Sequence, residues 1–301
     1  MARTITVGLD GSPESRTAAE WAAREAALRR MPVHLLHVWQ PVPEPIAQAP
    51  HLGAETHQHW AERIPRETAE DLRLRHPGVE ITTEQRTGTP SEVLLDAARD
   101  ADLLVLGSRA LSGLTGFLIG SVGQSVIARA ETPVVLVRAG EQAADEHLKD
   151  PAGIPSATTG FRPVVVGVDA GSPDETVLTF AFEEASRRKA SLTVLRAWNL
   201  PSSYTYALAA GYDPREDLAR AQAEALTEAL QPWREKYPDV EVSEDSRLGS
   251  PASHLVDAAR DASLVVVGRR MRRNPFGAHI GSVAHAVMHH ATAPVAVVAH
   301  D

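Results

Sequence analysis

The sequence predicts two α/β domains in tandem, each built on an open, doubly wound parallel sheet. The first observation is a repeat: residues 5–13 (ITVGLDGSP) return as residues 164–173 (VVVGVDAGSP), and DAARDA at 96–101 recurs unchanged at 257–262. Short runs of Val and Leu also alternate with helical segments, which is typical of parallel strands buried on both faces. The chain has 301 residues, a length that suits two domains of roughly 150 residues each.

Each copy is expected to contain the same elements in the same order. In the first copy, Ser12 and Pro13 suit the start of a helix, because Ser is a good N-cap and Pro is favoured at the first helical position. In the second copy, Ser172 and Glu175 have the spacing of a capping box. The first copy is expected to have strands at 5–9, 33–38, 79–85, 103–106 and 134–138. Its helices are expected at about 13–30, at 90–99 and at about 122–130, with a further one in a polar stretch that ends near His76.

The segment between the copies reads as a linker. Residues 140–160 are rich in Ala, Gly, Pro, Asp and Glu and show no apolar period. The expected boundaries are therefore 1–139 for the first domain and 161–301 for the second.

Composition excludes several classes of function. The net charge of −9 and pI near 5.8 argue against a general nucleic-acid binder and against adsorption to an anionic membrane. There is no cysteine, which excludes thiol catalysis, disulfides and thiolate metal sites. The N-terminal residues lack the charged segment followed by an apolar segment that is typical of a signal peptide. The sequence also has no apolar run long enough to cross a bilayer. A cytoplasmic location is expected.

Candidate ligand-binding residues follow the strands, because ligands of open α/β sheets bind beyond the carboxyl ends of the strands. Asp10 and Asp169 each end a first strand beside a helix start. Such a carboxylate can contact a ribose hydroxyl or Mg²⁺, or serve only as a turn or cap residue. For an isolated Asp the turn role is the commoner one. Val38 and Ala197, near the ends of the second strands, offer backbone to a flat base or are simply buried strand ends.

A glycine-containing loop follows the fourth strand of each copy, at 107–121 and 268–282. Both loops end in Gly-Ser at a predicted helix start, Gly120-Ser121 and Gly281-Ser282. The free N–H groups and the dipole of a helix N-terminus favour an anion there, and glycine permits close approach to phosphate.

Together these motifs resemble the universal stress protein family over nearly the whole chain. The resemblance implies a Rossmann-like fold of the adenine nucleotide alpha hydrolase type, with strand order 3-2-1-4-5 in each copy and pseudo-two-fold symmetry. ATP-binding members carry Gly-x2-Gly-x9-Gly-Ser/Thr after the fourth strand, which matches 107–121 except at its second glycine. The resemblance implies an ATP site in the first copy, at Gly8, Asp10, Val38, Gly107, Ser108, Arg109, Ala110, Gly113, Gly120, Ser121 and Val122. It implies a second ATP site in the second copy, at Gly167, Asp169, Ala197, Gly268, Arg269, Arg270, Met271, Gly281, Ser282 and Val283. Asp10 and Asp169 are the implied Mg²⁺ ligands.

The departures from the family motif make the two copies unequal. The second glycine is Ala110 in the first copy and Met271 in the second. If that position needs a positive φ, Ala costs about 1 kcal/mol, and Met also adds bulk. The first copy is therefore expected to bind ATP and the second to bind it more weakly. The four arginines Arg269, Arg270, Arg272 and Arg273 either pair with phosphates or form a solvated basic loop.

The resemblance implies an ATP-binding regulator in stress or dormancy adaptation that is not a metabolic enzyme. The alternatives are an interaction module that has lost nucleotide binding, and a slow ATPase or adenylate-transferring enzyme. The implied partners are an adenine nucleotide and an unidentified protein. The resemblance also implies that the closing strands 134–138 and 295–299 pair within one chain, as a pseudo-dimer. Two whole chains could in addition form a homodimer. His285 and His289 have a spacing that could bind metal, but a surface pair is favoured.

Overall fold

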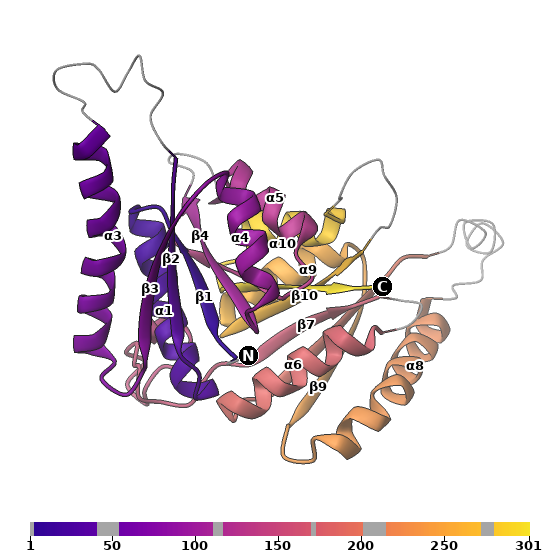
Figure 1. The fold of residues 1–301 in the computed structure, drawn as a ribbon. Helices are drawn as coiled ribbons and strands as arrows, with labels where there is room; N and C mark the ends of the chain where they lie inside the picture. Colours follow the sequence, from indigo (N-terminus) through magenta and orange to yellow (C-terminus); the bar gives the residue numbers. More distant parts are fainter. Residues whose placement is uncertain (1–2, 41–53, 111–116, 170–172, 201–214, 272–279) are drawn as a thin grey trace. The chain divides into compact units, whose positions relative to one another are not determined.

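The computed structural model describes residues 3–40, 54–110, 117–169, 173–200, 215–271 and 280–301, and for 54–61, 109–110 and 117–118 the backbone only. The chain divides into two compact units (Figure 1). Unit 1 contains Met1–Gln142, and unit 2 contains Ala143–Arg270 and Gly281–Asp301.

Unit 1 contains a five-stranded parallel sheet in the order β3-β2-β1-β4-β6, of which Figure 1 labels the first four strands. This confirms the predicted order 3-2-1-4-5. A short antiparallel strand, β5 (Phe117–Leu118), pairs with the end of β4. The parallel strands are β1 (Ile5–Leu9), β2 (Val33–Trp39), β3 (Ile81–Thr87), β4 (Leu103–Ala110) and β6 (Val134–Arg138).

Unit 2 repeats the sheet in the order β9-β8-β7-β10-β11, again with parallel pairs throughout. The central strands of both sheets are buried on both faces, as their runs of Val, Leu and Ile predict. The strands are β7 (Val164–Val168), β8 (Leu192–Trp198), β9 (Val242–Leu248), β10 (Leu264–Arg270) and β11 (Val295–His300).

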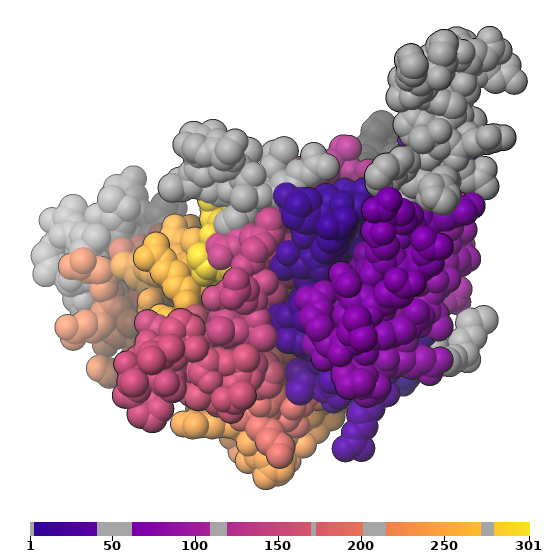
Figure 2. Space-filling view, turned by 90° about the vertical axis from the view of Figure 1, so that its left-hand side faces the viewer, coloured from indigo at the N-terminus to yellow at the C-terminus, as the bar shows by residue number. Residues whose placement is uncertain are grey.

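The helices of each unit form two layers against its sheet. In unit 1, α1 (Pro13–Arg29) and α3 (Ala54–Arg75) contact each other and lie side by side at the surface, indigo and purple in Figure 2. The second layer contains α4 (Pro90–Arg99) and α5 (Ser121–Arg129). Unit 2 has α6 (Glu175–Arg188), α8 (Arg215–Lys236), α9 (Pro251–Ala258) and α10 (Ser282–His290), with 3-10 turns at Ala143–Asp145 and Ala259–Asp261.

The starts of the first helices differ between the units. The predicted cap of α1 is confirmed: Ser12 is its N-cap, with the Oγ accepting from the Ser15 N–H, and Pro13 follows. The predicted capping box in unit 2 is wrong, because α6 begins at Glu175 and its N-cap is Asp174, whose carboxylate accepts from the N–H groups of the next helical residues. The Asp174 carboxylate accepts from the N–H groups of Thr176 and Val177, and Ser172 lies outside the described residues.

Residues 143–160 of the predicted linker are hydrogen-bonded structure within unit 2, and residues 140–142 belong to unit 1. The backbone N–H of Leu148 donates to the carbonyl of Gly160 at 2.8 Å, and that of Arg162 donates to Glu146 at 2.9 Å. His147 and Phe161 form an isolated antiparallel bridge between these bonds. The segment lacks an apolar period because its own backbone pairing, rather than an amphipathic face, holds it together.

Candidate functional site

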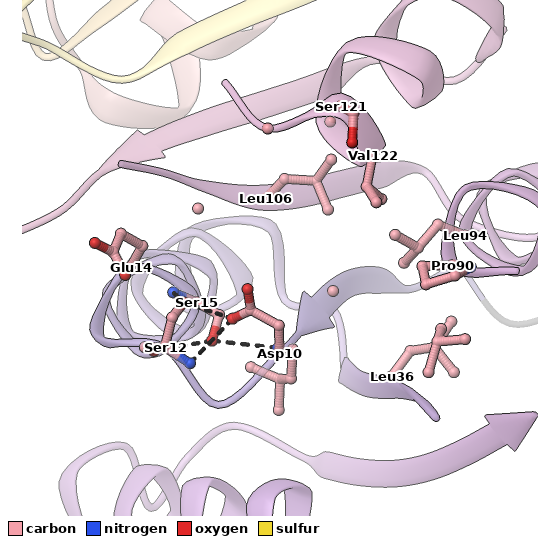
Figure 3. A pocket seen from close by; sticks show the side chains of 16 residues that line it. Asp10, Ser12, Glu14, Ser15, Leu36, Pro90, Leu94, Leu106, Ser121 and Val122 are labelled. Carbon is pink, nitrogen blue, oxygen red and sulfur yellow. Dashed lines mark hydrogen bonds between the residues drawn. The ribbon is translucent and has the colours of Figure 1, made fainter. Parts of the chain in front are cut away.

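Unit 1 contains a cavity of about 330 Å³ at the carboxyl ends of its parallel strands (Figure 3). This is the edge where ligands of doubly wound sheets bind. The N-terminal ends of three helices, α1, α4 and α5, all reach it. The lining residues are Gly8, Leu9, Asp10, Ser12, Glu14, Ser15, Leu36, Val38, Pro90, Leu94, Leu106, Gly107, Gly120, Ser121, Val122 and Gly123.

One side of the cavity is a hydrogen-bonded turn between β1 and α1. The Asp10 carboxylate accepts from the Ser12 backbone N–H at 3.0 Å and from the Ser12 hydroxyl at 2.5 Å (Figure 3). Gly11 has a φ of +82°, a conformation for which glycine is suited. Asp10 therefore does fill the turn role, and it does so while lining the cavity. Its carboxylate and that of Glu14 make this side acidic.

A second side of the cavity is the N-terminus of α5. The N-cap residue is Gly120, so no side chain accepts the first N–H groups of this helix. Gly120 has a φ of −60°, and a Cβ atom added to it would meet nothing within 4 Å. The backbone therefore does not need glycine at this position. What glycine provides is open space at a helix N-terminus, which suits close approach of an anion.

The third side of the cavity is apolar. Leu36, Pro90 and Leu94 lie together across the cavity from Asp10 and Ser12 (Figure 3). Leu106 also lines the cavity. An apolar wall with a few polar groups opposite is the usual composition of a small-molecule site.

The structure brings together seven residues of the predicted first site. Ser108 is not among them: its hydroxyl is buried and donates to the Val137 carbonyl at 3.4 Å. The physical reason is that β4 continues to Ala110, four residues beyond the predicted strand end. Arg109 and Ala110 lie in that strand, and Gly113 lies outside the described residues. The seven residues that line the cavity are Gly8, Asp10, Val38, Gly107, Gly120, Ser121 and Val122.

Sequence reasoning missed the contribution of two helix starts. Ser12, Glu14 and Ser15 belong to the start of α1, and Pro90 is the first residue of α4. The signal was available, because each of these helices follows a parallel strand and so begins at the same edge of the sheet.

The matching positions of unit 2 have different surroundings. Asp169 lies 4.0 Å from the Arg270 guanidinium, an exposed ion pair. Arg269 lies in β10 and is only 4 % exposed, so a solvated loop does not describe it. Arg272 and Arg273 lie outside the described residues. One part of the predicted anion site is present in unit 2, namely a helix N-terminus without a side-chain cap. Gly281 is the N-cap of α10, and Ser282 and Val283 begin that helix.

The remaining positions of the second copy are packed about as closely as their counterparts in the first copy. Ala197 is buried. A Cβ on Gly167 would lie 2.7 Å from Leu255, and one on Gly268 would lie 2.9 Å from the His300 ring. Met271 is half-buried just after β10. Gly8 and Gly167 are equally confined, since a Cβ on Gly8 would lie 2.7 Å from Leu106, whereas Gly107 faces the backbone of Glu14 and Gly268 faces a side chain.

The candidate metal-binding pair of the second copy lies on α10. His285 and His289 lie with ring centroids 4.4 Å apart on α10. Within the described ranges, no group of three or more His, Asp or Glu side chains is placed to hold a metal ion. The helices of the described chain include none that is both long and apolar enough to span a membrane.

Comparisons with known proteins agree with the fold and with the repeat. The family model described as "Universal stress protein family" matches residues 1–138 and 160–299. A universal stress protein of Mycolicibacterium smegmatis is 35% identical over 305 residues, covering 98% of this chain and 96% of the relative. Universal stress protein Rv2005c of Mycobacterium tuberculosis is 34% identical over 310 residues, covering 97% and 96%. The crystal structure of a universal stress protein from Archaeoglobus fulgidus has the same fold, with a TM-score of 0.70 at 16% identity and full coverage of both chains. The chain therefore belongs to the universal stress protein family.

Proposed function

We propose that unit 1 binds ATP in its cavity and that the protein acts as a nucleotide-responsive regulator in the cytoplasm, in stress or dormancy adaptation. The observation that carries this proposal is the uncapped N-terminus of α5, which lies in one cavity with an apolar wall. The adenine would pack against Leu36, Pro90 and Leu94. The phosphates would accept the free N–H groups that begin α5 and the Ser121 hydroxyl.

Magnesium fits the acidic side of the same cavity. Asp10 and Glu14 are the two acidic residues of the lining, and the proposed ligand is itself anionic. Mg²⁺ is commonly held by one or two carboxylates together with substrate phosphates. We propose that Asp10 holds the ion, which would neutralise charge between the protein and the phosphates.

The composition of the lining favours binding over catalysis. No Lys, Arg or His is among the lining residues identified in the described chain, whereas phosphoryl transfer is commonly assisted by such cations. The Asp10 carboxylate is already bonded to Ser12. We therefore propose a protein that is not a metabolic enzyme and whose bound nucleotide changes its contacts with a partner protein.

Unit 2 is proposed to bind nucleotide more weakly than unit 1. The His300 ring lies beside Gly268, and Asp169 is paired with Arg270. A ligand would have to compete with both contacts.

The direct test is calorimetric titration of nucleotide-stripped protein with ATP in the presence and absence of Mg²⁺. We expect one strong site, with tighter binding when Mg²⁺ is present. Absence of heat in both titrations, together with no nucleotide in the mass spectrum of heat-denatured protein, would favour the interaction module instead. Steady phosphate release that is lost in Asp10→Ala would favour the slow ATPase.

A further inference from the structure

Unit 2 contains a group of buried and half-buried polar side chains on the face of its sheet that α8 covers. Successive residues of a strand point to opposite faces, so Arg196 and Trp198 in β8 share one face and Ala197 lies on the other. The Arg196 Nη1 donates to the backbone carbonyl of Gln222 in α8 at 3.3 Å. This bond identifies the face of Arg196 and Trp198 as the α8 side. The predicted nucleotide position at Ala197 lies on the opposite side of the sheet.

A third side chain joins this face from the neighbouring strand. Ser246 in β9 is the direct register partner of Arg196 in β8. Register partners of adjacent strands lie about 5 Å apart and point to the same face. We call Arg196, Trp198, Gln222 and Ser246 the α8-side cluster.

Apart from Arg196, the residues of the α8-side cluster each have one buried side-chain atom without a hydrogen-bond partner in the described chain. The three atoms are the Nε1 of Trp198, the Oε1 of Gln222 and the Oγ of Ser246. Trp198 is only 6 % exposed and Arg196 only 8 %. Buried polar atoms in native proteins are nearly always hydrogen-bonded, and leaving one unpaired costs stability. Three such atoms on the α8 side are therefore available to a polar ligand or to an ordered water.

Unit 1 shows how the same position is satisfied without a ligand. His37 in β2 is the counterpart of Arg196, and its Nδ1 is 2.8 Å from the Leu9 carbonyl, to which it can donate. Gln85 is the register partner of His37, as Ser246 is of Arg196. Neither Gln85 nor Trp39 has a buried unpaired side-chain atom in the part of unit 1 that the structure describes. The unpaired atoms therefore occur in the unit that has Arg196 and Ser246 at the positions of His37 and Gln85.

We propose that the α8-side cluster binds a small oxyanion that also carries a hydroxyl group, of which hydrogen phosphate is the simplest example. The Trp198 indole N–H and the Ser246 hydroxyl would donate to its anionic oxygens, and Arg196 supplies positive charge beside them. The Gln222 Oε1 accepts, so it requires a donor, and the hydroxyl of the ligand provides one. This site is separate from the nucleotide cavity and does not depend on the proposed function.

The test is a phosphate titration of full-length protein, ¹⁵N-labelled and dialysed free of phosphate, followed by NMR. The chain has five Trp residues, and comparison with Trp198→Phe assigns the Trp198 indole N–H signal. We expect this signal to shift in a saturable way, while that of Trp39, the matching residue of unit 1, stays in place. In Ser246→Ala, phosphate should bind at least about tenfold more weakly, because a bond to a charged group is lost.

Three results would overturn the proposal. The first is a Trp198 signal that does not move, the second is a signal that moves without saturating, and the third is unchanged affinity in Ser246→Ala. Phosphate that binds instead in the nucleotide cavity would shift the backbone amides of Ser121 and Val122 and leave the Trp198 indole unmoved. ATP titration of Trp198→Phe separates the two sites, since ATP binding in unit 1 should be retained there whatever the outcome for phosphate.

Discussion

A Cβ atom placed on Gly107 would lie 2.5 Å from the backbone carbonyl carbon of Glu14. At Gly107, β4 therefore passes directly against the first turn of α1, backbone to backbone. Neither partner can move away as a flexible side chain could. Gly107 was predicted as part of a phosphate loop, and the structure gives it a packing role as well.

The first prediction is that Gly107→Ala destabilises unit 1 by about 3 kcal/mol, the upper range for overpacking a well-packed site. Urea unfolding monitored by circular dichroism measures the loss. The matched control is Gly268→Ala, where the added Cβ would meet the His300 ring and a Val177 methyl. These side chains can rotate, so about 1 kcal/mol or less is expected. Equal losses in the two variants would contradict the backbone contact.

The second prediction is that Gly120→Ala weakens ATP binding at least about tenfold while changing stability by no more than about 1 kcal/mol, the cost of Ala at an N-cap. The added methyl enters open space at the N-terminus of α5, where the phosphates are proposed to lie. Calorimetric titration and urea unfolding measure the two effects.

Gly281→Ala is the control for the second prediction. Gly281 has nearly the same backbone angles, φ −58° and ψ 151°, at the N-cap of α10. The stability change should match that of Gly120→Ala, and ATP affinity at the strong site should be unchanged. If Gly281→Ala removes the strong site instead, unit 2 rather than unit 1 is the main binder.

The repeat and the residue pattern were sufficient to predict the sheet. Val-rich runs such as Leu103–Leu106 have few alternatives to a buried parallel strand, and the strand order followed from the family resemblance. The extension of β4 to Ala110 was not predictable, because Ser108 and Arg109 carry no strand pattern and are held by pairing with β6 and β5.

The site was predicted where it depends on local sequence and was missed where it depends on packing. Gly120-Ser121 could be recognised as a helix start from the chain alone. Leu36 and Leu94 could not be assigned to one wall, because they come from different elements and meet only in the fold. The three unpaired atoms of the α8-side cluster were also unpredictable, since burial and hydrogen bonding are three-dimensional properties.

The third prediction concerns a buried ion pair in α6. Glu184 and Arg188 have side chains that are 0 % exposed and bonded to each other. Glu184→Gln would remove the negative charge of this buried pair and its bond to Arg187, and we expect a loss of about 3–5 kcal/mol in the free energy of unfolding.

Glu183→Gln is the matched control in the same helix. Glu183 pairs with Arg187 at 2.6 Å, but its side chain is 41 % exposed. Exposed pairs of this kind contribute about 1 kcal/mol or less. A Glu184→Gln variant as stable as Glu183→Gln would show that the buried pair contributes no more than a surface pair.

The fourth prediction is a pH dependence from the edge strand β3. The Arg86 guanidinium, hydrogen-bonded to Glu84 at 2.7 Å, lowers the pKa of that carboxyl below its ordinary value of 4.5, and His34 adds to the effect. Because the folded pKa is the lower one, the stabilisation is present in full above the unfolded pKa and is lost as the pH falls through the folded pKa.

The measurement for this fourth prediction is an NMR titration of the Glu84 side-chain carboxyl carbon. In Arg86→Gln the pKa of Glu84 should rise toward 4.5, because the largest cause of its lowering is removed. Unfolding of wild type and Glu84→Gln should differ most near neutral pH and converge in acid. Arg247→Gln in unit 2, which removes the partner of Asp245 on the matching edge strand β9, should leave the Glu84 titration unchanged. A Glu84 pKa that does not respond to Arg86→Gln would mean that His34, rather than the arginine, sets its acidity.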